Sequence, residues 1–195
     1  MPTIIARSSC SQPPEEISGP WLEIDLEAIT HNLRQIQQIV GTSRLMPVIK
    51  ANAYGHGLVD IGRHLERLDV FGLCVGTFSE ALSLRENKIL CPLLNLGLFS
   101  GSEAKQAIAD DISLVLFDDR AELLNTLAAQ LGKKARVHVK IDTGLGRVGV
   151  NYRHGLTFLR HLQRMKNVVI DGIYTSLTED ISYDRLQLRR FTELC

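Results

Sequence analysis

Helical and strand-like hydrophobic periods alternate along this chain from Trp21 onward, and this alternation limits its fold more than any other feature. Strands are predicted at 45–50, 70–75, 93–96, 113–117, 137–141 and 168–174. Helices are predicted between Asp25 and Gly41, from the loop after 57 to 68, and at 78–86, 103–109, 121–131, 154–165 and 184–194. Strands that alternate with helices form a parallel sheet covered by helices, so we expect an α/β fold.

Two α/β architectures fit this pattern, an open doubly wound sheet and a (β/α)₈ barrel. The sequence contains about six βα units after an opening helix, whereas a full barrel needs eight strands and typically ~250 residues. A barrel would therefore be incomplete. Residues 1–20, rich in proline and serine, are interpreted as a flexible leader without the apolar core of a secretory signal, and 21–195 as the partial barrel.

Composition argues against several classes of partner. Basic and acidic residues both number 22, so no net charge draws the chain to nucleic acid or an anionic membrane. No apolar stretch is long enough to cross a bilayer, and no residues show metal-ligand spacing. The four cysteines form no C-x-x-C pair and are interpreted as small buried hydrophobic residues. We expect a cytoplasmic protein without a metal, nucleic-acid or membrane partner.

Lys50 is the first candidate for chemistry, because it ends an apolar strand and precedes a glycine-rich loop at 52–57. In a barrel, the carboxyl ends of the strands build the active site. Partial burial of the lysine stem among Met46, Val48 and Ala51 would disfavour the ammonium form, so the amine would become a nucleophile able to form a Schiff base. A surface lysine that keeps its amine in water is the alternative. Tyr54, in the loop, either points inward or shapes the loop.

Arg147 is the second candidate and lies within Gly144-Leu145-Gly146-Arg147-Val148-Gly149. Read literally, this segment is G-x-G-x-x-G after a strand with Asp171 further on, which is the pattern of a dinucleotide-binding loop. That pattern normally opens the first βαβ unit of a domain, whereas here about four units precede it, and an arginine would crowd the turn that a pyrophosphate approaches. The preferred interpretation is a glycine-shaped loop that directs Arg147 toward carboxylates or other oxyanions.

The segment from Val48 to Gly57, Val-Ile-Lys-Ala-Asn-Ala-Tyr-Gly-His-Gly, resembles the cofactor-lysine signature of alanine racemases. Further segments resemble the family in order and spacing: 21–26 with Asn32, 71–85, 140–149, 172–175 and 187–194. The resemblance covers nearly all of 21–195. It implies a (β/α)₈ barrel that binds pyridoxal phosphate, followed by a C-terminal β-domain that this chain lacks, working as a homodimer.

By match to these motifs, the resemblance assigns roles to four residues. Lys50 would carry the pyridoxal-phosphate Schiff base and act as the base on one face of the substrate α-carbon. Tyr54 resembles a tyrosine that contacts the cofactor phosphate. Arg147 resembles the arginine that binds the cofactor's phenolic oxygen near the substrate carboxylate, and Lys140 a lysine, sometimes carbamylated, that positions this arginine. At Ser176 the family usually has a histidine that packs against the cofactor ring, and serine cannot stack there.

The resemblance therefore predicts an isomerase that interconverts L-alanine and D-alanine, a cell-wall precursor. The chain stops where the family continues to the rest of the phosphate site, the arginine facing the pyridine nitrogen and the tyrosine that serves as the second base. Two alternatives stay open. One is a racemase for another amino acid, and the other is a non-catalytic cofactor-binding or regulatory remnant.

Overall fold

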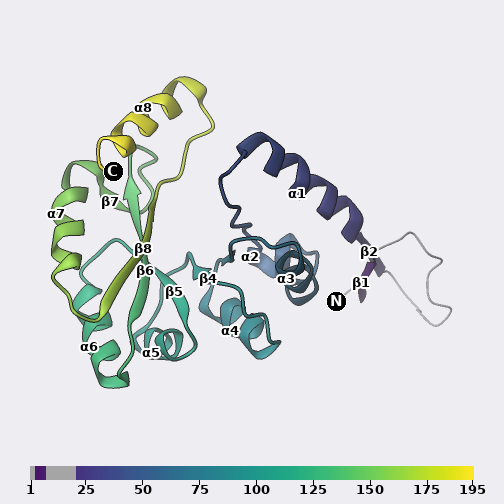
Figure 1. The fold of residues 1–195 in the computed structure, drawn as a ribbon, viewed down its shortest axis with the longest axis horizontal. Coiled ribbons are helices and arrows are strands. Elements are labelled where there is room, and N and C mark those ends of the chain that lie inside the picture. The colour runs from purple at the N-terminus through teal and green to yellow at the C-terminus, as the bar shows by residue number, and fades with distance from the viewer. Residues whose placement is uncertain (1–2, 8–20) are drawn as a thin grey trace. The chain divides into compact units, whose positions relative to one another are not determined.

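The structure, a computed structural model, describes residues 3–7 and 21–195 (Figure 1). The chain forms two compact units, Met1–Leu93 and Leu94–Cys195. Strands pair in parallel within the described residues, as the predicted α/β alternation requires. No helix in these ranges is both long enough and apolar enough to span a bilayer.

The first unit contains three short strands and four helices within the residues that the structure describes. Its elements are β1 Thr3–Arg7, β2 Trp21–Asp25, α1 Leu26–Val40, α2 Lys50–Tyr54, α3 Leu58–Arg67, β3 Leu73–Val75 and α4 Phe78–Glu86. Helix α1 begins where the sequence predicts, because the Asp25 carboxylate accepts hydrogen bonds from Glu27 N and Ala28 N at 2.8 and 3.2 Å. Buried aliphatic side chains form the core of this unit: Ile61, Leu65, Leu73, Leu84 and Ile89.

Part of the predicted leader is a strand. β1 pairs in parallel with β2, in a register that places Thr3 beside Trp21 and Arg7 beside Asp25. Residues 1–2 and 8–20 lie outside the described residues. The flexibility of the leader and the domain boundary at residue 21 therefore stay predictions.

The predicted strand at 45–50 is reduced to extended backbone with one β-bridge, between Val48 and Cys74. This segment still runs beside β3, since Cys74 N donates to Pro47 O and Ile49 N donates to Cys74 O, both at 2.8 Å. Pro47 has no N–H and interrupts the ladder. The segment nevertheless fixes the point at which Lys50 leaves the sheet.

The second unit is a parallel sheet with helices packed on it. The boundary between the two units falls within β4, Leu93–Asn95. The elements after it are α5 Gly101–Ala109, β5 Ile112–Leu116, α6 Ala121–Leu131, β6 Ala135–Asp142, β7 Val150–Asn151, α7 Tyr152–Gln163, β8 Val168–Tyr174 and α8 Ile181–Thr192. Strands β5 and β8 flank β6, and β7 pairs with the carboxyl end of β6. Figure 1 shows α6 and α7 packed along β6 and β8.

Side chains of β6 alternate between two faces of the sheet. Val137, Val139 and Ile141 are wholly buried and form the apolar face. The alternate positions are polar: Arg136, His138, Lys140 and Asp142. One face of this strand therefore contributes to the apolar core, and the other carries its polar side chains.

The cysteines that the structure describes differ in exposure, and Cys10 lies outside the described residues. Cys74 is buried and Cys91 is half-buried, and burial raises the pKa of each thiol to about 11. The prediction of buried cysteines is wrong for Cys195, which is exposed because it lies beyond the end of α8.

Candidate functional site

Lys50 begins α2, and its side chain is exposed. The predicted partial burial of its stem among Met46, Val48 and Ala51 is wrong, because the chain turns at Lys50, beyond the apolar segment. A Cβ added to Gly76 would lie 3.0 Å from Lys50 Cβ and 3.5 Å from Lys50 Cδ, so glycine at this position leaves room for the lysine stem. Within the ranges that the structure describes, the amine has no hydrogen-bond or ion-pair partner.

The backbone after Lys50 forms a left-handed turn where the sequence predicts only a glycine-rich loop. Four consecutive residues other than glycine have positive φ: Ala51 at 53°, Asn52 at 56°, Ala53 at 52° and Tyr54 at 54°. Each such residue costs roughly 1–2 kcal/mol, because Cβ comes close to the following carbonyl. Strain of this kind persists where surrounding contacts impose it, and it is concentrated at functional sites.

Hydrogen bonds within the turn hold this conformation. Ala53 N donates to Ile49 O at 2.9 Å, in the manner of a helical turn. The side chain of Asn52 adds a second restraint, because its Oδ1 accepts from Leu58 N at 2.8 Å and so joins the turn to the start of α3. The turn that carries Lys50 is thereby tied to the elements on both sides.

Glu80, on α4, supplies a restraint that is distant in sequence. Its Oε1 accepts from Asn52 N at 3.2 Å, and its Oε2 accepts from Gly76 N and Thr77 N at 3.0 and 3.2 Å. Thr77 caps α4 in return, since its hydroxyl accepts from Glu80 N at 3.3 Å. One carboxylate thus connects the Lys50 turn with the β3–α4 connection.

Tyr54 lies at the end of the turn and is 59% exposed. None of the described residues forms a hydrogen bond with its hydroxyl. His56 has a structural contact, since its Nδ1 lies 2.9 Å from Ala53 O. Both residues border a mainly apolar hollow of about 380 Å³ between α1 and the 45–49 segment. Tyr54 is therefore available to a ligand, whereas His56 helps to shape the turn.

Lys140 lies near the carboxyl end of β6 and is only 7% exposed. Burial lowers the pKa of its ammonium group, the neighbouring Arg147 lowers this pKa further, and Asp142 opposes the shift. The Lys140 Nζ lies 5.6 Å from the centroid of the Tyr174 ring. A cation near a buried ammonium group favours either an anionic neighbour or the neutral form of the lysine.

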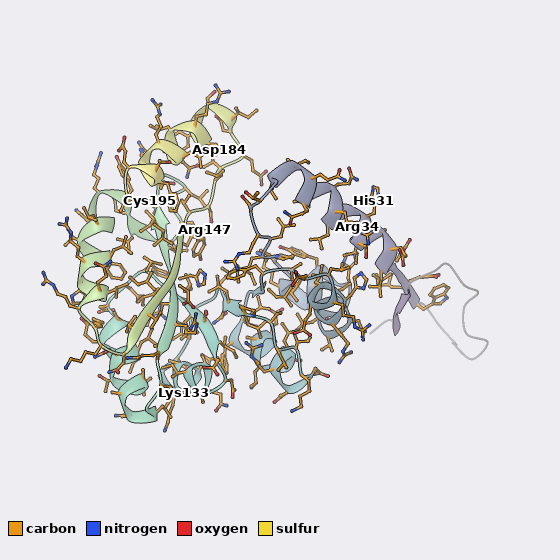
Figure 2. The ribbon with its side chains drawn as sticks, in the orientation of Figure 1. His31, Arg34, Lys133, Arg147, Asp184 and Cys195 are labelled. Carbon is orange, nitrogen blue, oxygen red and sulfur yellow. The ribbon has the colours of Figure 1, made fainter. Side chains whose placement is uncertain are left out.

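Arg147 lies on the exposed loop between β6 and β7, at the end of β6 nearest α8 (Figure 2). Asp142 shapes this loop, because its Oδ1 accepts from Gly144 N at 3.0 Å and from Gly146 N at 3.1 Å. Gly149 has φ 138°, and a Cβ there would lie 2.7 Å from Asp142 N. The close approach of the Asp142 backbone thus explains why position 149 is a glycine. This agrees with the preferred interpretation of the motif as a loop shaped by its glycines.

The loop geometry disfavours a dinucleotide site. The G-x-G-x-x-G segment is followed by β7, and α7 begins only at Tyr152. The side chain of Asn151 already caps α7 by accepting from Arg153 N at 3.0 Å. Asp171, the acidic residue of the pattern, forms an ion pair with Arg136 at 2.7 Å.

Helix α8 contributes a buried residue that the sequence analysis did not single out. Gln187 is wholly buried, and its Nε2 donates to Thr143 Oγ1 at 3.1 Å and to Ser176 O at 3.0 Å. It therefore joins the carboxyl ends of β6 and β8. Sequence gives little sign of this role, because Gln187 is one polar residue on a helix that is largely polar.

Two further residues of α8 hold the loop that carries Arg147. Arg190 Nη1 donates to Thr143 O at 2.7 Å, and the Tyr183 hydroxyl donates to Gly144 O at 3.3 Å. We call Tyr183, Gln187 and Arg190 the α8 clamp. It fixes the start of the loop from one side, while Asp142 fixes it from within.

The structure thus groups the predicted site residues in pairs. Lys50 and Tyr54 share one turn of the first unit, and Lys140 and Arg147 lie together in the second. Ser176 follows β8, and its carbonyl is engaged by Gln187.

The chain is similar to alanine racemases over most of its length. A family model described as "Alanine racemase, N-terminal domain" matches residues 24–195. "Alanine racemase 2" of Caldanaerobacter subterraneus subsp. tengcongensis is 36% identical over 187 residues, which cover 92% of this chain and 48% of that protein. The alanine racemase of Methanococcus maripaludis is 34% identical over 184 residues, which cover 90% of this chain and 49% of that protein. The chain spans about half the length of the curated relatives that it matches.

Solved structures agree with these relatives. An alanine racemase from Clostridium difficile 630 aligns with a TM-score of 0.83 at 30% identity, over 87% of this chain and 49% of that chain. A histidine racemase from Leuconostoc mesenteroides aligns with a TM-score of 0.79 at 23% identity, which shows a shared fold alone. The predicted incomplete barrel is confirmed by the match to half of a solved chain of this fold.

Proposed function

Because the chain belongs to the alanine racemase N-terminal domain family, we propose that it supplies the cofactor lysine of a racemase that interconverts L-alanine and D-alanine. The family depends on pyridoxal phosphate. The observation that supports the proposal most directly is the exposed Lys50 amine, which has no partner among the described residues and stands on a strained, well-restrained turn.

The residues present fit this cofactor. An aldehyde needs an accessible amine, and Lys50 offers one beside Gly76, where a side chain would crowd the lysine stem. A phosphate needs donors, and the exposed hydroxyl of Tyr54 is available on the same turn. When bound, pyridoxal phosphate withdraws electrons from the α-carbon of an amino acid and makes its C–H acidic.

Lys50 would move the proton on one face of the α-carbon. Its amine accepts the α-proton when neutral and returns a proton as the ammonium. A positioned acid–base group of this kind is typically worth ~10²–10⁴ in rate. The turn after Lys50 restricts where the backbone can place Nζ, and this restriction is what a positioned base requires.

Arg147 and Lys140 would act on the oxygens of the ligand. The planar guanidinium of Arg147 is exposed, and it can bind a phenolic oxygen or a carboxylate in a forked geometry. The lowered pKa of Lys140 increases the fraction of neutral amine relative to an ordinary lysine, and the neutral amine is the form that reacts with carbon dioxide to give a carbamate and a released proton. Such a carbamate would replace a repelling cation beside Arg147 with an accepting anion.

The substrate, the oligomeric state and the cellular location are also part of the proposal. Alanine as substrate, a homodimer and a cytoplasmic location are proposed from family membership. A racemase for another amino acid is compatible with the fold, since the histidine racemase shares it. Racemisation of alanine, compared with that of histidine and serine, distinguishes the substrates.

Covalent trapping tests the proposal. The 195-residue chain is incubated with pyridoxal phosphate, reduced with borohydride and mapped by peptide mass. We expect the label on Lys50 and its loss in Lys50→Ala. A label distributed over surface lysines and unchanged in Lys50→Ala would contradict the proposed role. Labelling of Lys50 without any racemisation would identify a cofactor-binding protein that is not catalytic by itself.

A further inference from the structure

We propose that Glu80 is a positioning residue for Lys50, acting through the backbone of the left-handed turn. The inference rests on the proposed function of Lys50 as the cofactor lysine. It concerns a residue that lies on α4, about one βα unit beyond the lysine, and that contacts the turn with only one of its two oxygens.

The contact with Asn52 satisfies a backbone group that the turn cannot satisfy itself. The first N–H groups of any helical turn have no acceptor within the turn. Asn52 is only two residues past Lys50, and its N–H donates to Glu80 Oε1 at 3.2 Å. A charged acceptor makes such a bond roughly twice as strong as a neutral one. Glu80 therefore stabilises the strained conformation next to the lysine.

The other oxygen of Glu80 orders the surface on which the lysine stem lies. Oε2 accepts from Gly76 N at 3.0 Å and from Thr77 N at 3.2 Å. Gly76 is also the residue whose added Cβ would lie 3.0 Å from Lys50 Cβ. One carboxylate thus fixes both the backbone that carries Lys50 and the glycine against which its stem packs.

The bridge needs two acceptor oxygens, and this requirement makes it testable with a nearly isosteric change. In Glu80→Gln only one oxygen remains, so either Asn52 N or the pair at Gly76 and Thr77 faces an NH₂ group that cannot accept. Glu80→Asp keeps both oxygens on a side chain shorter by one carbon, so it should not span both sides.

Helix α5 provides a matched control. Glu103 occupies the same capping-box position, where its Oε2 accepts from Ser100 N at 2.7 Å and its own N donates to Ser100 Oγ at 3.3 Å. This box requires one acceptor oxygen, which glutamine retains. Glu103→Gln therefore repeats the chemical change at a helix start of the second unit, where the carboxylate serves its own capping box.

The experiment follows the rate at which pyridoxal phosphate is trapped by borohydride on Lys50, relative to the exposed Lys105 in the same sample. The lysine amine condenses with the aldehyde and releases water, and borohydride then delivers hydride to the C=N carbon. We expect Glu80→Gln to lower the Lys50-to-Lys105 ratio about 10–100-fold, since small displacements of a reacting group cost rates of this order. Glu103→Gln should leave the ratio unchanged.

The outcomes separate this inference from the proposed function. Absence of preferential Lys50 labelling in the unaltered chain contradicts the proposed function. Preferential labelling that Glu80→Gln leaves unchanged overturns the positioning role alone. If Glu80→Gln does not fold, amide hydrogen exchange of the unaltered chain still tests whether Glu80 binds the Asn52 N–H. Asn52 N–H should be protected like Ala53 N–H, and free exchange at Asn52 beside a protected Ala53 would overturn the inference.

Discussion

Replacing Gly144 by alanine tests whether the α8 clamp dictates the loop that carries Arg147. Gly144 has φ 144°, and an added Cβ would lie 2.5 Å from the Tyr183 hydroxyl oxygen and 2.9 Å from Arg190 Nη1. Gly146 is the matched control in the same loop, since it also has positive φ, 70°, but a Cβ there meets nothing within 4 Å. The two substitutions therefore separate backbone strain from collision with the clamp.

The magnitudes follow from these contacts. Gly146→Ala should cost about 1–2 kcal/mol, the usual cost of a left-handed residue with a Cβ. Gly144→Ala carries backbone strain of roughly 1–3 kcal/mol. It also displaces Arg190, whose bond to Thr143 O is worth about 1.5–3 kcal/mol because its donor is charged. We therefore expect a loss of about 4 kcal/mol for Gly144→Ala.

Thermal unfolding followed by circular dichroism measures the difference. In a chain of this size 1 kcal/mol corresponds to about 2–4 °C in Tm, so the difference of about 2–3 kcal/mol should make Gly144→Ala lower Tm by about 4–12 °C more than Gly146→Ala. Tyr183→Ala removes the atom nearest to the new Cβ. It should therefore rescue Gly144→Ala partly, with a coupling of about 1–2 kcal/mol in a double-mutant cycle. Equal losses for the two glycines, with no coupling to Tyr183, would refute a clamp that shapes the loop.

Three further predictions follow from single side chains. Burial lowers the pKa of His138, so the unfolded chain binds more protons than the folded chain. The free energy of unfolding should therefore fall as pH decreases through about 6.5 and stay unchanged at higher pH. Urea unfolding midpoints measured across this range should show no such fall from this residue in His138→Asn. Removing the guanidinium in Arg147→Ala should raise the pKa of Lys140, and an NMR titration that shows no rise would contradict their proximity. Leu84 is wholly buried and Leu90 is 77% exposed, so Leu84→Ala should cost about 2–5 kcal/mol in urea unfolding and Leu90→Ala almost nothing.

Much of the secondary structure could be predicted because its signals are local. Asp25 caps α1 within three residues, and the hydrophobic period of β8 gives its bounds at 168–174 without error. The strand at 45–50 was overpredicted, since Pro47 breaks the ladder although its neighbours are apolar. Apolar composition therefore predicts burial better than it predicts regular hydrogen bonding.

The details of the candidate site depend on distant residues, and the sequence could not supply them. Alanine and tyrosine do not favour a left-handed turn, and the contact with Glu80 that supports it spans 28 positions. The burial of Gln187 depends in the same way on Thr143, 44 positions earlier. Motif resemblance selects Lys50, Tyr54, Lys140 and Arg147 and assigns Lys140 to Arg147, but it does not indicate the contacts of Glu80 or of the α8 clamp.

The left-handed turn also has a consequence for the order of assembly. Local energetics oppose it, so it has little reason to form in an emerging chain before the helix that carries Glu80 is available. Lys50 would then acquire its geometry only after α4 has folded, although it precedes α4 by more than two dozen residues. A chain ending before Glu80 would display the complete lysine signature without a competent lysine. In pulse-labelled refolding, Asn52 N–H should gain protection no earlier than the amides of α4.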